Sequence, residues 1–117
     1  MWIAAIALSG FVALVFAANG AAKMLGHPKM IEASTHLGYS LRSFRIIGLF
    51  EVLGALGILL APLCVPLGVA AATGLILLTV GGFIAHLRAA DPIRVATPAL
   101  GCALLTAAAV GLQIVAV

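Results

Sequence analysis

Charged side chains are scarce in this sequence of 117 residues: they make up 8% of it, against about 25% in an ordinary globular domain. Hydrophobic residues make up 65%, and the mean hydropathy is +1.33. A soluble domain of this length has too little interior to hide so much apolar material, and a disordered chain would be far more polar. Both classes are excluded, which leaves an integral membrane protein whose first partner is the lipid bilayer.

Aromatic residues, cysteines and metal-ligand clusters are equally sparse. The six Lys and Arg residues and the 6% of aromatic residues cannot form the dense basic face of a nucleic-acid binder, so no nucleic-acid partner is expected. No metal-ligand cluster, haem ligand pair or CxxC motif is present, so neither a metal site nor an intrinsic cofactor is expected. Cys64 and Cys102 fall at different depths of the predicted bundle, which predicts two free thiols.

Three long stretches carry no charge at all: residues 1–22, 52–85 and 95–117. A helix needs about 20 apolar residues to cross a bilayer, so the first and last stretches each supply one crossing. The middle stretch is too long for one helix, and Pro62 and Pro66 indicate a tight turn between two. The sequence therefore predicts an all-α, integral membrane four-helix bundle that forms one transmembrane domain over the whole chain. The four helices are expected at about 2–23, 43–61, 66–87 and 96–116.

The connection between the first two helices has a pattern of its own. Pro28 favours a helix start and Gly38 a helix end, which predicts a short helix at about 28–37. Its apolar side is formed by Met30, Ile31, Ser34 and Leu37. This pattern is typical of an amphipathic helix lying in the membrane interface, and it also fits a cap over a cavity.

The positions of the basic residues predict the orientation. All six Lys and Arg lie in or beside the connections that join the first helix to the second and the third to the fourth. Cytoplasmic loops carry the excess of Lys and Arg. We therefore expect a multi-pass protein of the cell membrane with both termini outside the cytoplasm.

Small residues recur every four positions on the first and last helices. Such stripes let membrane helices approach closely, within one bundle or between two copies in a homodimer. The stripes are Ala5, Ser9, Ala13, Ala17 and Ala21, and Ala99, Ala103, Ala107 and Gly111.

Glu51 is the most informative polar residue, because it falls about eight residues into the second predicted helix. A carboxylate at that depth needs a partner or a cavity. Side chains lean toward the N-terminus of their own helix, so Lys23 and His86 lean into the membrane while Glu51 leans back toward them. Asn19 lies one turn before Lys23 on the same face. The four are predicted to form a ligand-binding cluster, with a structural Lys23–Glu51 ion pair as the alternative.

The polar positions fall within four short motifs: Asn19-Gly20-x-x-Lys23-Met24-x-Gly26, Leu37-Gly38-Tyr39-Ser40, Gly48-x-x-Glu51-x-x-Gly54-Ala55 and His86-x-Arg88-x-x-Asp91. These motifs resemble those of the DoxX-like family of small four-helix membrane proteins. The resemblance implies a membrane component associated with quinone-linked oxidation or redox-stress complexes, and one distant relative is a receptor-assembly chaperone.

Three functions are consistent with these observations. The first is an accessory component of a redox system that binds a quinone or another small lipophile at Asn19, Lys23, Glu51 and His86. The second is a membrane enzyme that isomerises, hydrates or hydrolyses an apolar substrate, with Glu51 and His86 as the catalytic base and acid. The third is a chaperone or assembly subunit that binds a partner membrane protein and no ligand.

Overall fold

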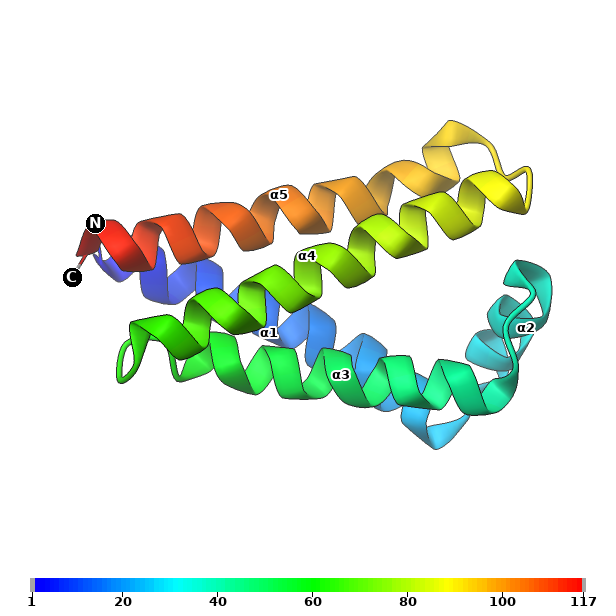
Figure 1. The fold of residues 1–117 in the computed structure, drawn as a ribbon, viewed down its shortest axis with the longest axis horizontal. Coiled ribbons are helices and arrows are strands. Elements are labelled where there is room, and N and C mark those ends of the chain that lie inside the picture. The colour runs from blue at the N-terminus through cyan, green and yellow to red at the C-terminus, as the bar shows by residue number, and fades with distance from the viewer. Residues whose placement is uncertain (1, 117) are drawn as a thin grey trace.

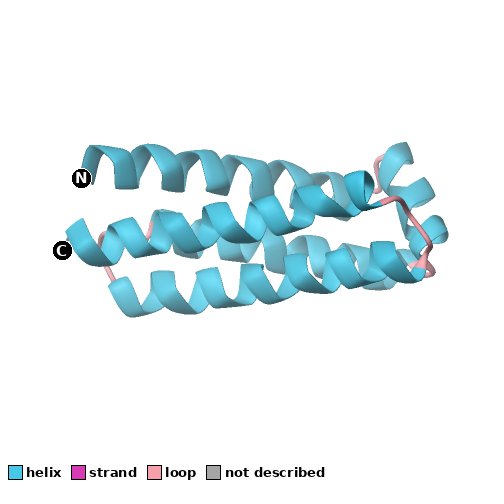
Figure 2. Cartoon of the chain, turned by 90° about the horizontal axis from the view of Figure 1, so that it is seen from above, coloured by secondary structure: helices cyan, strands magenta, loops and turns pink. Residues whose placement is uncertain are grey.

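The computed structural model describes residues 2–116, which form α-helices joined by short connections. Four long helices run side by side, and a short helix lies across one end of them, opposite the end where the first helix begins and the last one ends (Figures 1 and 2). The predicted all-α class is confirmed, and the described residues contain no strand. The helices are α1 (Trp2–Leu25), α2 (Pro28–Leu37), α3 (Leu41–Leu59), α4 (Val65–Arg88) and α5 (Ile93–Ala116).

Three of the described helices, α1, α4 and α5, are long and apolar enough to cross a membrane. The chain is therefore an integral membrane protein. Helix α3 is 19 residues long and carries the charged residues Arg42, Arg45 and Glu51. The predicted four-span topology requires α3 to cross the membrane as well.

The bounds of α5 and α3 differ from the sequence prediction by two or three residues. Helix α5 begins at Ile93 rather than near residue 96, because the Pro92 carbonyl accepts the backbone N–H groups of Val95 and Ala96. Pro98 therefore lies inside the helix, at the cost of one backbone hydrogen bond. Helix α3 spans residues 41–59 instead of about 43–61, because the Ser40 side chain caps its first turn.

Helices α1 and α3 cross at two facing glycines. A Cβ on Gly20 would lie 2.5 Å from the Gly48 carbonyl oxygen, and a Cβ on Gly48 would lie 2.6 Å from that of Gly20. No side chain fits between the two backbones, so glycine is required on both sides. This crossing brings Lys23, one turn after Gly20, next to Glu51, one turn after Gly48.

The predicted small-residue stripes have different outcomes on the two helices. On α1, Ala5, Ser9 and Ala13 are buried within the chain, as packing inside one bundle requires. On α5, Ala107 is exposed, because the buried face shifts position along the helix instead of repeating every four residues. A buried hydrogen bond of 3.1 Å from Gln113 Nε2 to Ser9 Oγ, which the stripe pattern does not reveal, joins the two helices. The buried residues of α5 are Ala96, Ala103, Thr106, Ala109 and Gln113.

Candidate functional site

A cavity of about 410 Å³ lies between the four long helices and extends to α2. We call it the polar cavity, because most of its wall is apolar but polar side chains from several elements also line it. These polar residues are Asn19, Lys23, Tyr39, Glu51, Thr79 and His86.

Lys23 and Glu51 form a direct ion pair between α1 and α3 on the wall of this cavity. The side chains are 18% and 7% exposed, so both charges are largely removed from solvent. Lys23 Nζ also lies 5.1 Å from the centre of the Phe44 ring, a distance that allows a cation–π interaction. The Lys23 contact uses Glu51 Oε1, and Oε2 has no hydrogen-bond partner among residues 2–116.

His86 lines the cavity from the last turn of α4 but does not contact Glu51 directly. Its Nδ1 lies 2.8 Å from Asp91 Oδ2, in the connection between α4 and α5. Asp91 Oδ1 lies 2.6 Å from Nε2 of His36, which comes from α2. The hydrogen bonds from His86 and, second, from His36 hold the pKa of the Asp91 carboxyl below its ordinary value of 3.8.

Asn19 lines the cavity, but its amide is engaged locally. Its Nδ2 donates a hydrogen bond of 3.0 Å to the Val15 carbonyl, one turn earlier in α1. The predicted cluster is thus brought to the wall of one cavity, and of its four side chains only those of Lys23 and Glu51 are joined by a hydrogen bond or ion pair.

Asp91 and His36 are the site residues that sequence reasoning missed. Asp91 lies five residues after His86, past the end of α4, where helical spacing no longer predicts contacts. The backbone N–H of Asp91 bonds the His86 carbonyl at 3.0 Å, and Ala90 between them has a φ of 60°. This turn returns the carboxylate to the His86 ring. A His followed by an Asp just beyond a helix end is the sequence signal that could have indicated it.

Helix α2 covers the end of the polar cavity with one face. Met30, Ala33 and Leu37 line the cavity, whereas Ile31, which was predicted on the same face, is 42% exposed. The 100° turn per residue carries Ile31 past the edge of the face that lines the cavity, so the predicted apolar side only partly coincides with that face. The predicted position of α2 in the membrane interface stays a prediction.

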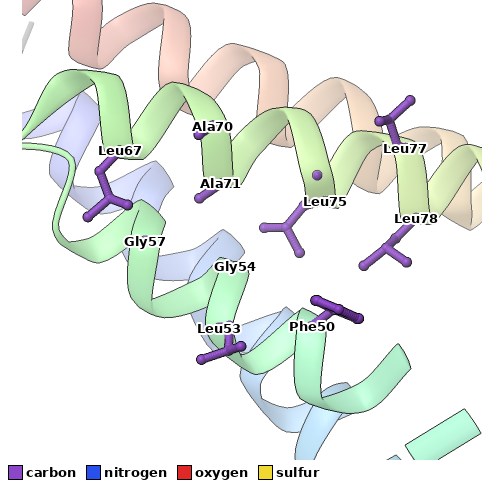
Figure 3. Close-up of a pocket in the computed structure, with 11 residues that line it drawn as sticks. Phe50, Leu53, Gly54, Gly57, Leu67, Ala70, Ala71, Leu75, Leu77 and Leu78 are labelled. Carbon is purple, nitrogen blue, oxygen red and sulfur yellow. The ribbon is translucent and has the colours of Figure 1, made fainter. Parts of the chain in front are cut away.

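A second, larger hollow of about 510 Å³ lies along α3 and α4, and we call it the α3–α4 groove. Figure 3 shows Phe50 and Gly54 of α3 on one side of it and Ala71 and Leu75 of α4 on the other. No residue that lines the groove carries a charge or a polar side chain. It therefore offers a surface for lipid chains but no group that would orient a polar ligand.

Cys102 is a further cavity residue to which sequence reasoning gave no role. It lines the polar cavity from α5. Cys64 is exposed and lies directly before α4, and both cysteines are free thiols, as predicted. Among residues 2–116, no three His, Cys, Asp or Glu side chains lie close enough together to hold a metal ion.

The sequence profile of the DoxX-like family matches residues 7–114, nearly the whole chain. No curated protein and no solved structure matches this chain significantly. The family match agrees with the resemblance seen in the motifs, and it spans every residue described at the site.

Proposed function

Because the chain belongs to the DoxX-like family and its polar residues line one cavity, we propose that it binds a small lipophile there, as an accessory component of a redox system. The cavity volume of about 410 Å³ lies in the range of about 300–1,000 Å³ that is usual for small-molecule sites. The single observation that carries the proposal is the grouping of the four predicted polar residues on one otherwise apolar wall.

The chemistry of the wall supports an amphipathic ligand. The apolar part would lie against side chains such as Phe16, Met30 and Leu78, which line the cavity. The polar end would meet the Lys23–Glu51 pair and His86. The family resemblance favours a quinone, whose carbonyl oxygens can accept hydrogen bonds from Lys23 and Tyr39. The chain would then hold the quinone, and a partner protein would exchange electrons with it.

A membrane enzyme is the second candidate, and one observation favours it. Glu51 Oε2 and His86 Nε2 both lack hydrogen-bond partners among residues 2–116, and both residues line the cavity. A carboxylate and an imidazole placed in this way could serve as base and acid on an apolar substrate. Turnover by the purified single chain would select this function over binding alone.

We also propose that α3 makes a fourth crossing, which places α2 on the cytoplasmic side and both termini outside. Helix α3 packs beside α1 and α4 along the bundle (Figure 1). The charges of α3 lie toward the end covered by α2 or are paired inside, which supports the crossing. A reporter that is active only in the cytoplasm, fused after Val117, should stay inactive, and strong activity would contradict the orientation.

Cys102 provides the test of lipophile binding, because it reports on the cavity from within. Protein purified gently in mild detergent should carry a small molecule detectable by native mass spectrometry, and Cys102 should alkylate slowly. Extraction of the lipophile should speed the alkylation of Cys102 and leave that of Cys64 unchanged. A stable complex with another membrane protein, no bound molecule and no change at Cys102 would instead support an assembly subunit.

A further inference from the structure

Asp91 uses both carboxylate oxygens to hold two histidines from different elements. Oδ2 lies 2.8 Å from Nδ1 of His86 on α4, and Oδ1 lies 2.6 Å from Nε2 of His36 on α2. The carboxylate itself is only 12% exposed. One acidic residue therefore joins a wall of the polar cavity to the helix that covers it.

The backbone holds Asp91 in this place at some strain. Helix α4 ends in a turn in which the N–H of Asp91 bonds the His86 carbonyl at 3.0 Å and the N–H of Ala90 bonds that of Leu87 at 3.1 Å. Such a turn needs a left-handed residue, usually glycine, and here Ala90 adopts it with a φ of 60°. Glycine fills the equivalent position at the end of α2, where Gly38 has a φ of 81°. The strained turn fixes the carboxylate next to the His86 ring.

The contact determines which nitrogen of His86 is left for a ligand. A neutral imidazole carries one proton, and a hydrogen bond from Nδ1 to a carboxylate keeps the proton on Nδ1. Nε2 is then a hydrogen-bond acceptor, and it has no partner among residues 2–116. Glu51 Oε2, on α3, is a second acceptor without a partner in the same part of the chain.

We propose that Asp91 is a positioning residue that orients His86 with Nε2 as an acceptor, and that the bound lipophile carries a hydroxyl group which donates to it. The inference rests on the proposed function and adds the chemical class of the ligand. Among quinones this class is the reduced hydroquinone form, whose hydroxyl groups donate hydrogen bonds. Oxygens that only accept, as in the oxidised quinone or an ether, would leave both acceptors without a partner.

The first test needs no ligand. In protein with ¹⁵N-labelled histidine in phosphatidylcholine nanodiscs near neutral pH, the NMR shifts of His86 should show the proton on Nδ1 and a bare Nε2. Asp91→Ala should move the proton toward Nε2. His36→Ala removes the other arm of the carboxylate and should leave His86 unchanged, as should Glu32→Gln, which alters an exposed carboxylate of α2. A proton on Nε2 in the unmodified protein would overturn the positioning role.

The second test compares 4-octylphenol with 4-octylanisole, its methyl ether, in lipophile-extracted protein. The phenol should protect Cys102 from alkylation with an affinity about tenfold higher than the ether, which corresponds to one hydrogen bond to a polar group otherwise unpaired. Asp91→Ala should remove this preference while the binding of the ether stays the same. Equal protection by both probes would overturn the ligand class. Protection by neither would contradict lipophile binding itself and the ligand class with it, and the His86 shifts would still decide the role of Asp91.

Discussion

The polar cavity and the α3–α4 groove are two hollows of similar size with opposite chemistry. The groove is the larger, about 510 Å³ against about 410 Å³, yet only apolar side chains line it. The cavity is lined by the Lys23–Glu51 pair and by His86, and α2 covers its end. In a membrane protein, lipid chains can fill an apolar hollow at no cost, so volume alone does not indicate a site. Polar and charged side chains placed inside the membrane do indicate one.

The packing at the two hollows differs in the same sense. Beside the cavity, α1 and α3 meet backbone to backbone at Gly20 and Gly48. In the groove, Gly74 has no atom within 4 Å of the position where a Cβ would lie. Helices α3 and α4 also meet closely beside the groove, where a Cβ on Gly54 would lie 2.6 Å from the Leu75 side chain. The α1–α3 crossing is thus closed by backbone on both sides, whereas α3 and α4 meet through side chains and leave open space beside Gly74. The predictions below test this contrast, beginning with the largest effect.

Breaking the ion pair of the cavity should have the largest effect on stability. Lys23→Met leaves the Glu51 charge without its partner and should lower the free energy of unfolding by about 3 kcal/mol, as for other buried pairs. The double variant Lys23→Met/Glu51→Gln should recover most of the loss, because no charge is left stranded. Leu53→Met, at an exposed position that lines the groove and not the cavity, should change stability by less than about 0.5 kcal/mol. Unfolding in detergent measures all three, and equal losses in the single and double variants would contradict the account.

Adding one methyl group at the crossing should be the next largest effect. Gly48→Ala puts a Cβ against the Gly20 carbonyl and should cost about 2 kcal/mol, because the backbone has to move apart. Gly74→Ala is the matched change in the groove, where the space is open, and should be neutral or stabilise the helix by about 0.5 kcal/mol. The melting temperatures of the two variants test this prediction. A similar loss of stability in both would mean that the α1–α3 crossing is not tight.

A smaller effect, of opposite sign, is expected at the turn that holds Asp91. Ala90→Gly relieves a left-handed alanine and should stabilise the chain by about 0.5 kcal/mol, after the extra freedom of glycine in the unfolded chain is subtracted. Gly38→Ala, at the left-handed end of α2, should destabilise by a similar amount. The outcome that contradicts the account is a destabilised Ala90→Gly variant.

The smallest effect is the response of the Asp91 contact to acid. The pKa of this carboxyl is lowered in the folded chain by the hydrogen bonds from His86 and His36. Its contribution to stability is therefore present above the ordinary value of 3.8 and is lost as the pH falls through the lowered value. The difference in melting temperature between the unmodified protein and Asp91→Asn should narrow on acidification from about pH 6 to about pH 3. A difference that widens would have the wrong sign for this contact.

The sequence allowed the prediction of those features that follow from helical geometry and charge. The uncharged stretches indicated the long helices, and the lean of side chains toward helix N-termini brought Lys23 and Glu51 together. The sequence did not reveal the Asp91 contacts, because they depend on a non-helical turn at Ala90 and on how α2 folds back over the bundle. The start of α5 was also missed, because Pro92 supplies the carbonyl that begins the helix and Pro98 is tolerated inside it.

The central claim is that a lipophile occupies the polar cavity and not the groove, and two glycines of α4 test it most directly. Gly82 lines the cavity, Gly74 lines the groove, and a side chain added at either position has open space to enter. Native mass spectrometry of gently purified variants should show the bound molecule lost in Gly82→Leu and retained in Gly74→Leu. Retention in Gly82→Leu with loss in Gly74→Leu would contradict the account and place the ligand in the groove.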